Sequence, residues 1–243
     1  MSVLAIDTAT DQLGVALVDE ARVLASYEIL AERPHAVELP QAVTRVLQTA
    51  NQTLEQLEAI VVDIGPGSFT GLRIGVAFVK ALAFRTHKPV VGVASLDVVA
   101  AHLPLVPQAI CPILDAKQRK VYTACYRVVD GTLRKQSDYH LVTIEELPQL
   151  IKHDGPIVFL GDGVALYREQ LTHHYGSRAL FAAPELWMPR AATLGRLGRE
   201  RFHQGHADNP RDLVPLYLYP LTCSIQPKNT SSRRATPAAA SSS

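Results

Sequence analysis

Short apolar runs and longer stretches of helical periodicity follow one another along the first hundred residues. Runs of about five apolar residues are typical of buried strands, and apolar residues that recur every three or four positions are typical of helices. The pattern predicts three strands, a helix, a strand, a long helix, a strand and a short helix. These cover residues 3–7, 13–19, 23–29, 39–50, 60–64, 69–86, 90–93 and 95–102.

The same order begins again after residue 105. Two successive units, each opening with a strand that ends in an aspartate (Asp7 and Asp115), indicate an α/β protein with a duplicated ribonuclease-H-like fold. This is the two-lobed actin and Hsp70 (ASKHA) architecture, in which helices flank mixed sheets. The second unit is predicted as strands 109–115, 120–129 and 133–141, helix 143–151, strand 157–160, and helices 164–174 and 190–204.

The duplication divides the chain into an N-terminal lobe, residues 1–104, and a C-terminal lobe, residues 105–224. With 243 residues, of which 47% are hydrophobic, the chain is long enough to fill two compact lobes. Residues 225–243 are rich in alanine and serine and cannot bury a core, so we expect a disordered tail there.

The segment GPGSFTG, residues 65–71, lies between a predicted strand and the long helix. Gly65 and Gly67 are expected where the chain reverses with positive φ, and Ser68 or Thr70 is expected to cap the helix. Exposed N–H groups at a helix start also attract anions. The segment lacks the Lys-Ser/Thr of a P-loop and the spacing of a dinucleotide site. A structural turn is therefore favoured, and an anion site stays open as the alternative.

The helix at 69–86 is apolar around most of its circumference, so more than one side must be covered. One face, containing Leu72 and Val76, is expected to pack on the sheet. A second face, containing Gly71 and Gly75, allows another backbone to approach closely. Its occupant is either a neighbouring helix of the same chain or another subunit. Phe78 and Leu82 complete this second face.

The composition of the chain indicates which binding partners and which cellular compartment to expect. The net charge is +1, so the chain lacks the basic character of an independent nucleic-acid binder, and RNA contacts would be shared with a partner. Cys111, Cys125 and Cys223 form no C-x-x-C pair, which argues against a disulfide framework or a zinc site. No apolar run reaches the roughly 18 residues of a membrane span, and a strand opens the sequence, so we expect a cytoplasmic protein.

The turns after the two strand-ending aspartates lie where ATPases of this fold hold phosphate or metal. Both turns lack the glycines that let a backbone approach phosphate. They predict a degenerate nucleotide site formed by Asp7, Thr8, Thr10 and Asp115. The alternative function is an ATPase or kinase that acts through Asp7 and Asp115. A peptidase ranks last, because no nucleophile with a neighbouring base and no H-E-x-x-H motif is visible.

Five motifs together resemble the TsaB family, also called YeaZ, over about residues 3–219. They are LAIDTAT (4–10), GPGSFTGLRIG (65–75), GVASL (92–96), DAK with VY (115–117 and 121–122) and PLYL (215–218). The chain departs from the family at Asp63-Ile64, where Gly-Arg is more usual, and at Lys117 and Lys120, where Arg and Glu are usual.

The resemblance implies a noncatalytic scaffold that binds TsaD and supports threonylcarbamoyl transfer to adenosine 37 of tRNA. TsaD carries a His-x-x-x-His metal pair where this chain has Ser95 and Val99, so neither metal ligands nor catalytic residues are expected. The implied partners are TsaD and the ATPase TsaE, a homodimer when TsaD is absent, and tRNA only through the complex. No membrane contact is implied. No cofactor is implied either, with weak ATP or ADP binding at a subunit interface left open.

The partner interface is assigned to the helices at 39–50 and 69–86. Under this hypothesis Gly75→Leu weakens association and leaves the fold intact, because it adds bulk on a face turned away from the sheet. The assigned residues are Leu39, Val43, Val46, Leu47, Gly71, Gly75, Phe78 and Leu82.

Overall fold

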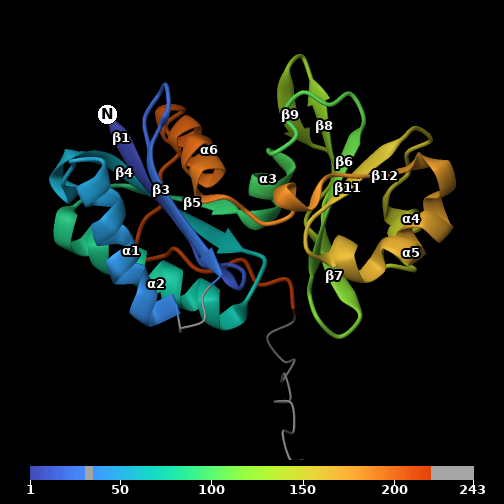
Figure 1. The fold of residues 1–243 in the computed structure, drawn as a ribbon, viewed down its shortest axis with the longest axis horizontal. Helices are drawn as coiled ribbons and strands as arrows, with labels where there is room; N and C mark the ends of the chain where they lie inside the picture. Colours follow the sequence, from blue (N-terminus) through green and yellow to red (C-terminus); the bar gives the residue numbers. More distant parts are fainter. Residues whose placement is uncertain (31–34, 220–243) are drawn as a thin grey trace, which may run out of the picture.

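A computed structural model describes residues 1–30 and 35–219 and shows two lobes, each built on one sheet (Figure 1). The first sheet has five strands in the order β3-β2-β1-β4-β5. β1 and β3 are antiparallel to β2, whereas β1, β4 and β5 run parallel to one another. The strands are Ser2–Asp7 (β1), Gln12–Val18 (β2), Val23–Leu30 (β3), Leu57–Gly65 (β4) and Val90–Ala94 (β5).

The second sheet repeats this plan. β6 pairs antiparallel with β7 and parallel with β11, as β1 does with β2 and β4. This repetition confirms the predicted duplicated ribonuclease-H-like fold. The order is β10-β7-β6-β11-β12, with β8 paired to β6 and β9 paired to β8. The strands are Ala109–Asp115 (β6), Lys120–Thr123 (β7), Tyr126–Val129 (β8), Thr132–Lys135 (β9), His140–Thr143 (β10), Ile157–Leu160 (β11) and Ala179–Phe181 (β12).

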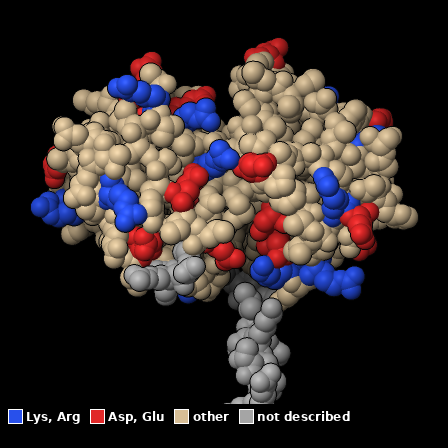
Figure 2. Space-filling model, in the orientation of Figure 1, with Lys and Arg blue, Asp and Glu red and all other residues tan. Residues whose placement is uncertain are grey.

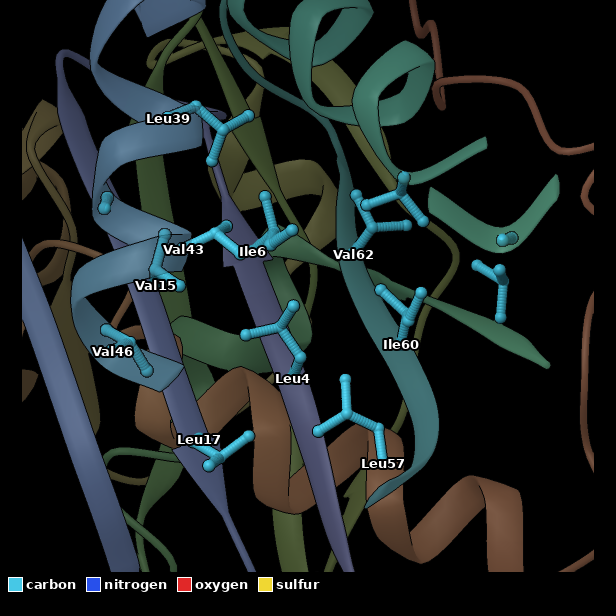
Figure 3. Packing of buried hydrophobic residues seen from close by; sticks show 14 of the residues in the cluster. Leu4, Ile6, Val15, Leu17, Leu39, Val43, Val46, Leu57, Ile60 and Val62 are labelled. Atoms are coloured by element: carbon cyan, nitrogen blue, oxygen red, sulfur yellow. The ribbon is translucent and has the colours of Figure 1, made fainter. Parts of the chain in front are cut away.

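Helices cover both faces of the first sheet. Leu4 and Ile6 of β1 pack toward α1 and α2, and Figure 3 shows them in one cluster with Val43 of α1. The alternate residues Val3 and Ala5 face α6. Because both faces of β1 are buried, its apolar run is continuous rather than alternating. The helices are His35–Thr49 (α1), Phe69–Thr86 (α2), Ser95–Ala100 (α3), Leu147–Leu150 (α4), Gly163–Tyr175 (α5) and Ala191–His203 (α6).

The glycine turn before α2 forms as predicted in two respects. Gly65 has φ +100°, and the Ser68 hydroxyl caps the helix by accepting the Gly71 N–H at 3.2 Å. Gly67 serves a different purpose from the predicted positive φ. A Cβ at that position would overlap the carbonyl oxygen of Ala9. Glycine is therefore required at this position because the turn after β1, which contains Ala9, lies too close for a side chain.

Several element boundaries differ from the prediction. The predicted strand 120–129 is interrupted at Ala124 and Cys125, which separates β7 from β8. The predicted strand 133–141 becomes β9 and β10, and helix 143–151 shortens to α4. α1 begins at His35, before the predicted start at residue 39. β12 was not predicted, because three residues are too few for a periodicity signal.

The predicted division of the chain at residues 104 and 105 is wrong in one respect. α6 returns from the second lobe to the first sheet, where Ala191 and Leu194 pack on β1 and its neighbours. The segment after α6 also contacts the first sheet, since the Asp208 N–H donates to the Val90 carbonyl of β5 at 2.8 Å. The first lobe thus contains residues from both ends of the chain. The tail predicted at 225–243 lies outside the described residues.

None of the helices in the described part of the chain combines the length and apolar character needed to cross a membrane.

Two glycines let α6 lie close against the sheet. A Cβ at Gly195 would be 2.7 Å from the Val18 side chain, and one at Gly198 would overlap Val61 of the central strand β4. We expect Gly198→Val to lower the free energy of unfolding by about 1–3 kcal/mol, because the packed strand cannot move aside. Denaturant titration would measure the loss. Glu200→Val, on the exposed side of α6, is the matched control, and an equal loss in both variants would contradict this account.

Candidate functional site at the junction of the lobes

The turn after β1 is held by the start of α2. The Asp7 carboxylate accepts the Ala9 N–H at 2.8 Å. The Thr8 hydroxyl donates to the Gly71 carbonyl at 2.8 Å, and the Ser68 N–H donates to the Ala9 carbonyl at 2.7 Å. The N–H groups of Ser68 and Gly71, which an anion would need, therefore already have partners within the chain. The structural turn is the alternative that this geometry favours.

Asp7 lies beside a second buried acid, Asp63. Ile6 and Val62 are paired in the parallel ladder, so the two aspartates that follow them are neighbours, one at the end of β1 and the other two residues before the end of β4. They are 2% and 0% exposed. Asp63 Oδ1 accepts the Ser95 hydroxyl at 2.6 Å and the Gly65 N–H at 2.7 Å. Among the residues that the structure describes, Asp63 Oδ2 has no hydrogen-bond partner.

Burial dominates the electrostatics of this pair. It raises the pKa of Asp63 to about 7, although the bonds from Ser95 and Gly65 oppose the change. Burial also raises the pKa of Asp7 well above its ordinary value, and the Asp63 charge adds to the effect. These carboxyls hold protons at pH values where an exposed aspartate is ionised. A closed carboxyl of this kind is poorly suited to bind a cation or to orient a nucleophile.

The matching acid of the second lobe, Asp115, is paired with the lysine two residues later. Its Oδ2 lies 2.6 Å from Lys117 Nζ, and its Oδ1 accepts the Lys117 N–H at 2.9 Å. Asp115 raises the pKa of Lys117, and Asp11 of the first turn also contributes, so the two turns act on one another across the junction. Lys117, Gln118 and Arg119 have φ of 62°, 50° and 60°. Three side chains thus occupy backbone conformations that usually favour glycine.

The junction between the lobes is itself tightly bonded. Asp97 of α3 accepts hydrogen bonds from Tyr126 at 2.7 Å and Tyr139 at 2.9 Å, both in the second lobe. Arg201 of α6 reaches the same carboxylate at 2.6 Å. Burial raises the pKa of both tyrosines. Further along the chain, the Tyr219 hydroxyl donates to the Ala116 carbonyl at 2.9 Å, beside the second turn.

Ser95 and Val99, the positions at which metal ligands were not expected, have structural roles. The Ser95 hydroxyl is buried and bonded to Asp63, and Val99 packs with residues of both lobes. Within residues 1–30 and 35–219, no group of three or more His, Cys, Asp or Glu side chains is arranged to hold a metal ion.

Most of the predicted interface residues contact the chain's own interior, which corrects the assignment. Leu39, Val43 and Val46 belong to the core between α1 and the sheet (Figure 3). A Cβ on Gly71 or Gly75 would overlap atoms of Thr8. Contrary to the interface hypothesis, we therefore expect Gly75→Leu to disturb the fold, because Thr8 of the turn after β1 covers that face. Leu47, Phe78 and Leu82 are only partly buried.

Sequence reasoning missed two features of this region. The outer face of α2 exposes Ala77, Ala81 and Phe84, of which Phe84 is 83% exposed. Helical spacing alone did not indicate which apolar face meets solvent. Asp63 was also missed as a site residue, although an acid that ends the apolar run Ile60–Val62 was a visible signal.

Charges are mixed over the molecule. Figure 2 shows lysines and arginines interspersed with acidic residues across both lobes on the face in view. This agrees with the net charge of +1, and the view contains no continuous basic stripe.

Comparisons with known proteins agree with one another. The profile of the family described as TsaD, tRNA N6-adenosine threonylcarbamoyltransferase, matches residues 28–221. The tRNA threonylcarbamoyladenosine biosynthesis protein TsaB of Bacillus subtilis is 34% identical over 90% of this chain and 94% of its own length. TsaB of Escherichia coli is 36% identical over 90% and 94%. The structure of YeaZ from Pseudomonas aeruginosa superposes with a TM-score of 0.77 at 28% identity, covering 89% and 99%.

The buried acid pair predicts an unusual pH dependence of stability. The folded-state pKa of Asp63 lies above its unfolded value, so the native state binds more protons between about pH 4 and pH 7. Stability is then highest on the acid side of this window and falls as the pH rises through 7. Asp7 acts in the same direction, because burial and the charges of Asp63 and Glu28 raise its pKa.

We expect Asp63→Asn to flatten this dependence and to raise the free energy of unfolding at pH 8 by about 1–3 kcal/mol. The asparagine oxygen can still accept from Ser95 and Gly65, and no charge is buried. Denaturant titrations from pH 5.5 to 8.5 would measure the difference, with Asp130→Asn on the surface as the control. Parallel curves for the native chain and Asp63→Asn would refute the assignment.

Proposed function

The chain belongs to the TsaB (YeaZ) family, and from this premise we propose that it is a noncatalytic subunit that binds a TsaD protein. In that complex it supports threonylcarbamoyl transfer to adenosine 37 of tRNA. The observation that carries the noncatalytic part is the closure of the first turn, where Asp7 is 2% exposed and the N–H groups of Ser68 and Gly71 are occupied.

The alternative ATPase or kinase needs an open phosphate turn and a charged acid. Asp7 is buried with a raised pKa, and Asp115 is neutralised by Lys117. The turn at 117–119 carries three side chains where phosphate-binding turns use glycine. These features disfavour turnover through Asp7 and Asp115. They leave room for a structural role of the same residues.

A peptidase is disfavoured by the bonding of the available nucleophiles. One solved structure from Pseudomonas aeruginosa, with a TM-score of 0.78, is described as similar to peptidase YeaZ. In this chain the Ser68 hydroxyl caps α2, the Ser95 hydroxyl donates to Asp63, and the Cys111 thiol contacts Thr123. Each of these groups serves the fold. Ser95 does have a carboxyl beside it, but Ser95 and Asp63 are both fully buried, which closes this pair to a peptide substrate.

The outer surface of α1 and α2 is the proposed docking face for TsaD. α1 and α2 cover the same side of the first sheet and contact each other. Small and apolar side chains are exposed along α2, at Ala77, Ala81 and Phe84. The predicted interface is thereby narrowed to the partly buried Leu47, Phe78 and Leu82 together with this exposed row. Two small residues allow a partner helix to approach closely, and the exposed Phe84 ring offers it an apolar contact.

Binding of this kind can activate TsaD without touching its substrate. A partner that binds only the competent conformer of TsaD raises the population of that conformer. The stiff junction of the lobes around Asp97 would make this subunit a rigid template. The mixed surface charge supports contact with tRNA only through the complex.

The remaining parts of the proposal concern assembly and compartment. We propose that TsaE joins the complex and that the same face forms a homodimer when TsaD is absent. The chain needs no cofactor of its own, and ATP or ADP binds weakly at the subunit interface. Its place is the cytoplasm, where tRNA is modified.

The isolated chain is expected to show no ATP hydrolysis above a buffer control and no tRNA modification. Addition of TsaD, TsaE and the TsaC-type enzyme that makes threonylcarbamoyl-adenylate should produce modified tRNA at a rate that depends on this chain. Phosphate release and mass spectrometry of nucleosides would measure both. Turnover by the chain alone that disappears in Asp115→Asn would support the ATPase or kinase instead.

The docking face can be tested without disturbing the core. We expect Ala77→Arg to weaken TsaD binding about tenfold or more, since it places a charge within an apolar contact. Ala165→Arg, on the exposed face of α5 in the other lobe, should bind normally. Calorimetry would measure affinity, and circular dichroism would confirm folding of both variants. Equal affinities would exclude this face as the interface.

A further inference from the structure

Two of the cysteines lie directly opposite each other in the second sheet. Ile113 pairs with Thr123 on β7, and Ile110 pairs with Tyr126 on β8. Both pairings belong to one antiparallel register, which places Cys111 opposite Cys125. The register of the strands gives this juxtaposition, although the cysteines are separated in sequence.

The backbone bonds of Cys125 show which kind of cross-strand pair this is. Its carbonyl accepts the Gln136 N–H at 2.7 Å, and its own N–H donates to the Ser137 hydroxyl at 2.9 Å. Both groups thus point away from β6. The two cysteines form a non-hydrogen-bonded pair, in which the Cα atoms are about 4.5 Å apart and the side chains are close. This separation lies within the range that a disulfide bridges.

The two thiols have different environments. Cys111 is fully buried, whereas Cys125 is partly exposed. The Cys111 thiol beside Cys125 lowers the pKa of Cys125. Burial raises the pKa of Cys111 well above its ordinary value. Cys125 is therefore the more reactive and accessible of the two.

We propose that Cys111 and Cys125 are a redox modification site that forms a reversible disulfide on exposure to a low-molecular-weight disulfide. The thiolate of Cys125 attacks one sulfur of the oxidant, whose S–S bond breaks and releases one thiol. Cys111 then gives up its proton to solvent and attacks the sulfur of Cys125, which releases the second thiol. The protein loses two electrons and two protons, and the oxidant gains them.

The cross-link would lie at a sensitive point of the second lobe. Ala124 and Cys125 separate β7 from β8, where the strand leaves the β6–β7 ladder for the β8–β9 hairpin. Tyr126, the next residue, bonds to Asp97 of the first lobe. A disulfide would therefore stiffen the point from which the second lobe holds the first. This role is independent of the proposed binding of TsaD.

The test uses the full chain carrying Cys223→Ser, because Cys223 lies outside the described residues. The protein is incubated with oxidised glutathione, blocked with N-ethylmaleimide in denaturant and digested with trypsin without reduction. Lys117, Arg119 and Lys120 lie between the cysteines, so trypsin separates them unless a disulfide joins them. We expect one cross-linked peptide pair, loss of both reactive thiols, and recovery of both on reduction.

Variants distinguish the roles of the two thiols. In Cys111→Ala, Cys125 should accumulate a mixed disulfide with glutathione, because nothing resolves it. In Cys125→Ser, Cys111 should stay unmodified. Circular dichroism checks folding, and the chain that retains both cysteines decides the question if either variant fails to fold. Two alkylated thiols after oxidation, or a stable glutathione adduct on Cys125 beside a free Cys111, would overturn the proposal.

Discussion

The position of α2 in the N-terminal lobe depends on close contact between the turn after β1 and the glycine segment at the start of this helix. Carbonyl and hydroxyl groups of Thr8 and Ala9 occupy the space that side chains at Gly67, Gly71 and Gly75 would take. The contact fixes α2 against the sheet and engages the Ser68 N–H, while the Ser68 hydroxyl caps the Gly71 N–H. The space beside the turn after β1 is thereby filled by the protein's own backbone.

Buried charge follows from the same compactness. Asp7 and Asp63 lie next to each other on adjacent strands, and both side chains are buried. Two acids in such a place are tolerated because they hold protons and because Ser95 and Gly65 donate to one of them. At the lobe junction the buried acid is instead paired with a cation and hydrogen-bond donors, since Arg201 and two tyrosines surround Asp97. Burial thus favours the protonated form of Asp7 and Asp63, whereas the Asp97 carboxylate is paired with Arg201 and two tyrosines.

Much of the fold could be predicted from the sequence. Long periodic segments such as α2 and buried strands such as β6 and β11 were predicted with their observed ends, and the order of elements was sufficient for the fold. Periodicity could not identify the occupant of an apolar face, so Gly71 and Gly75 were assigned to a partner when Thr8 covers them. It also could not show that α6 returns to the first sheet. Such contacts between distant segments depend on three-dimensional packing that local patterns do not encode.

The return of α6 has a consequence for the order of events during synthesis. The face of the first sheet that contains Val3, Ala5 and Val61 is covered by residues 191–203. A nascent chain emerging from the ribosome therefore displays this apolar face until residues 191–203 have emerged. The first lobe cannot be completed before the second has emerged, so the two lobes are joined in folding as well as in structure, and the nascent chain is a natural client for chaperones.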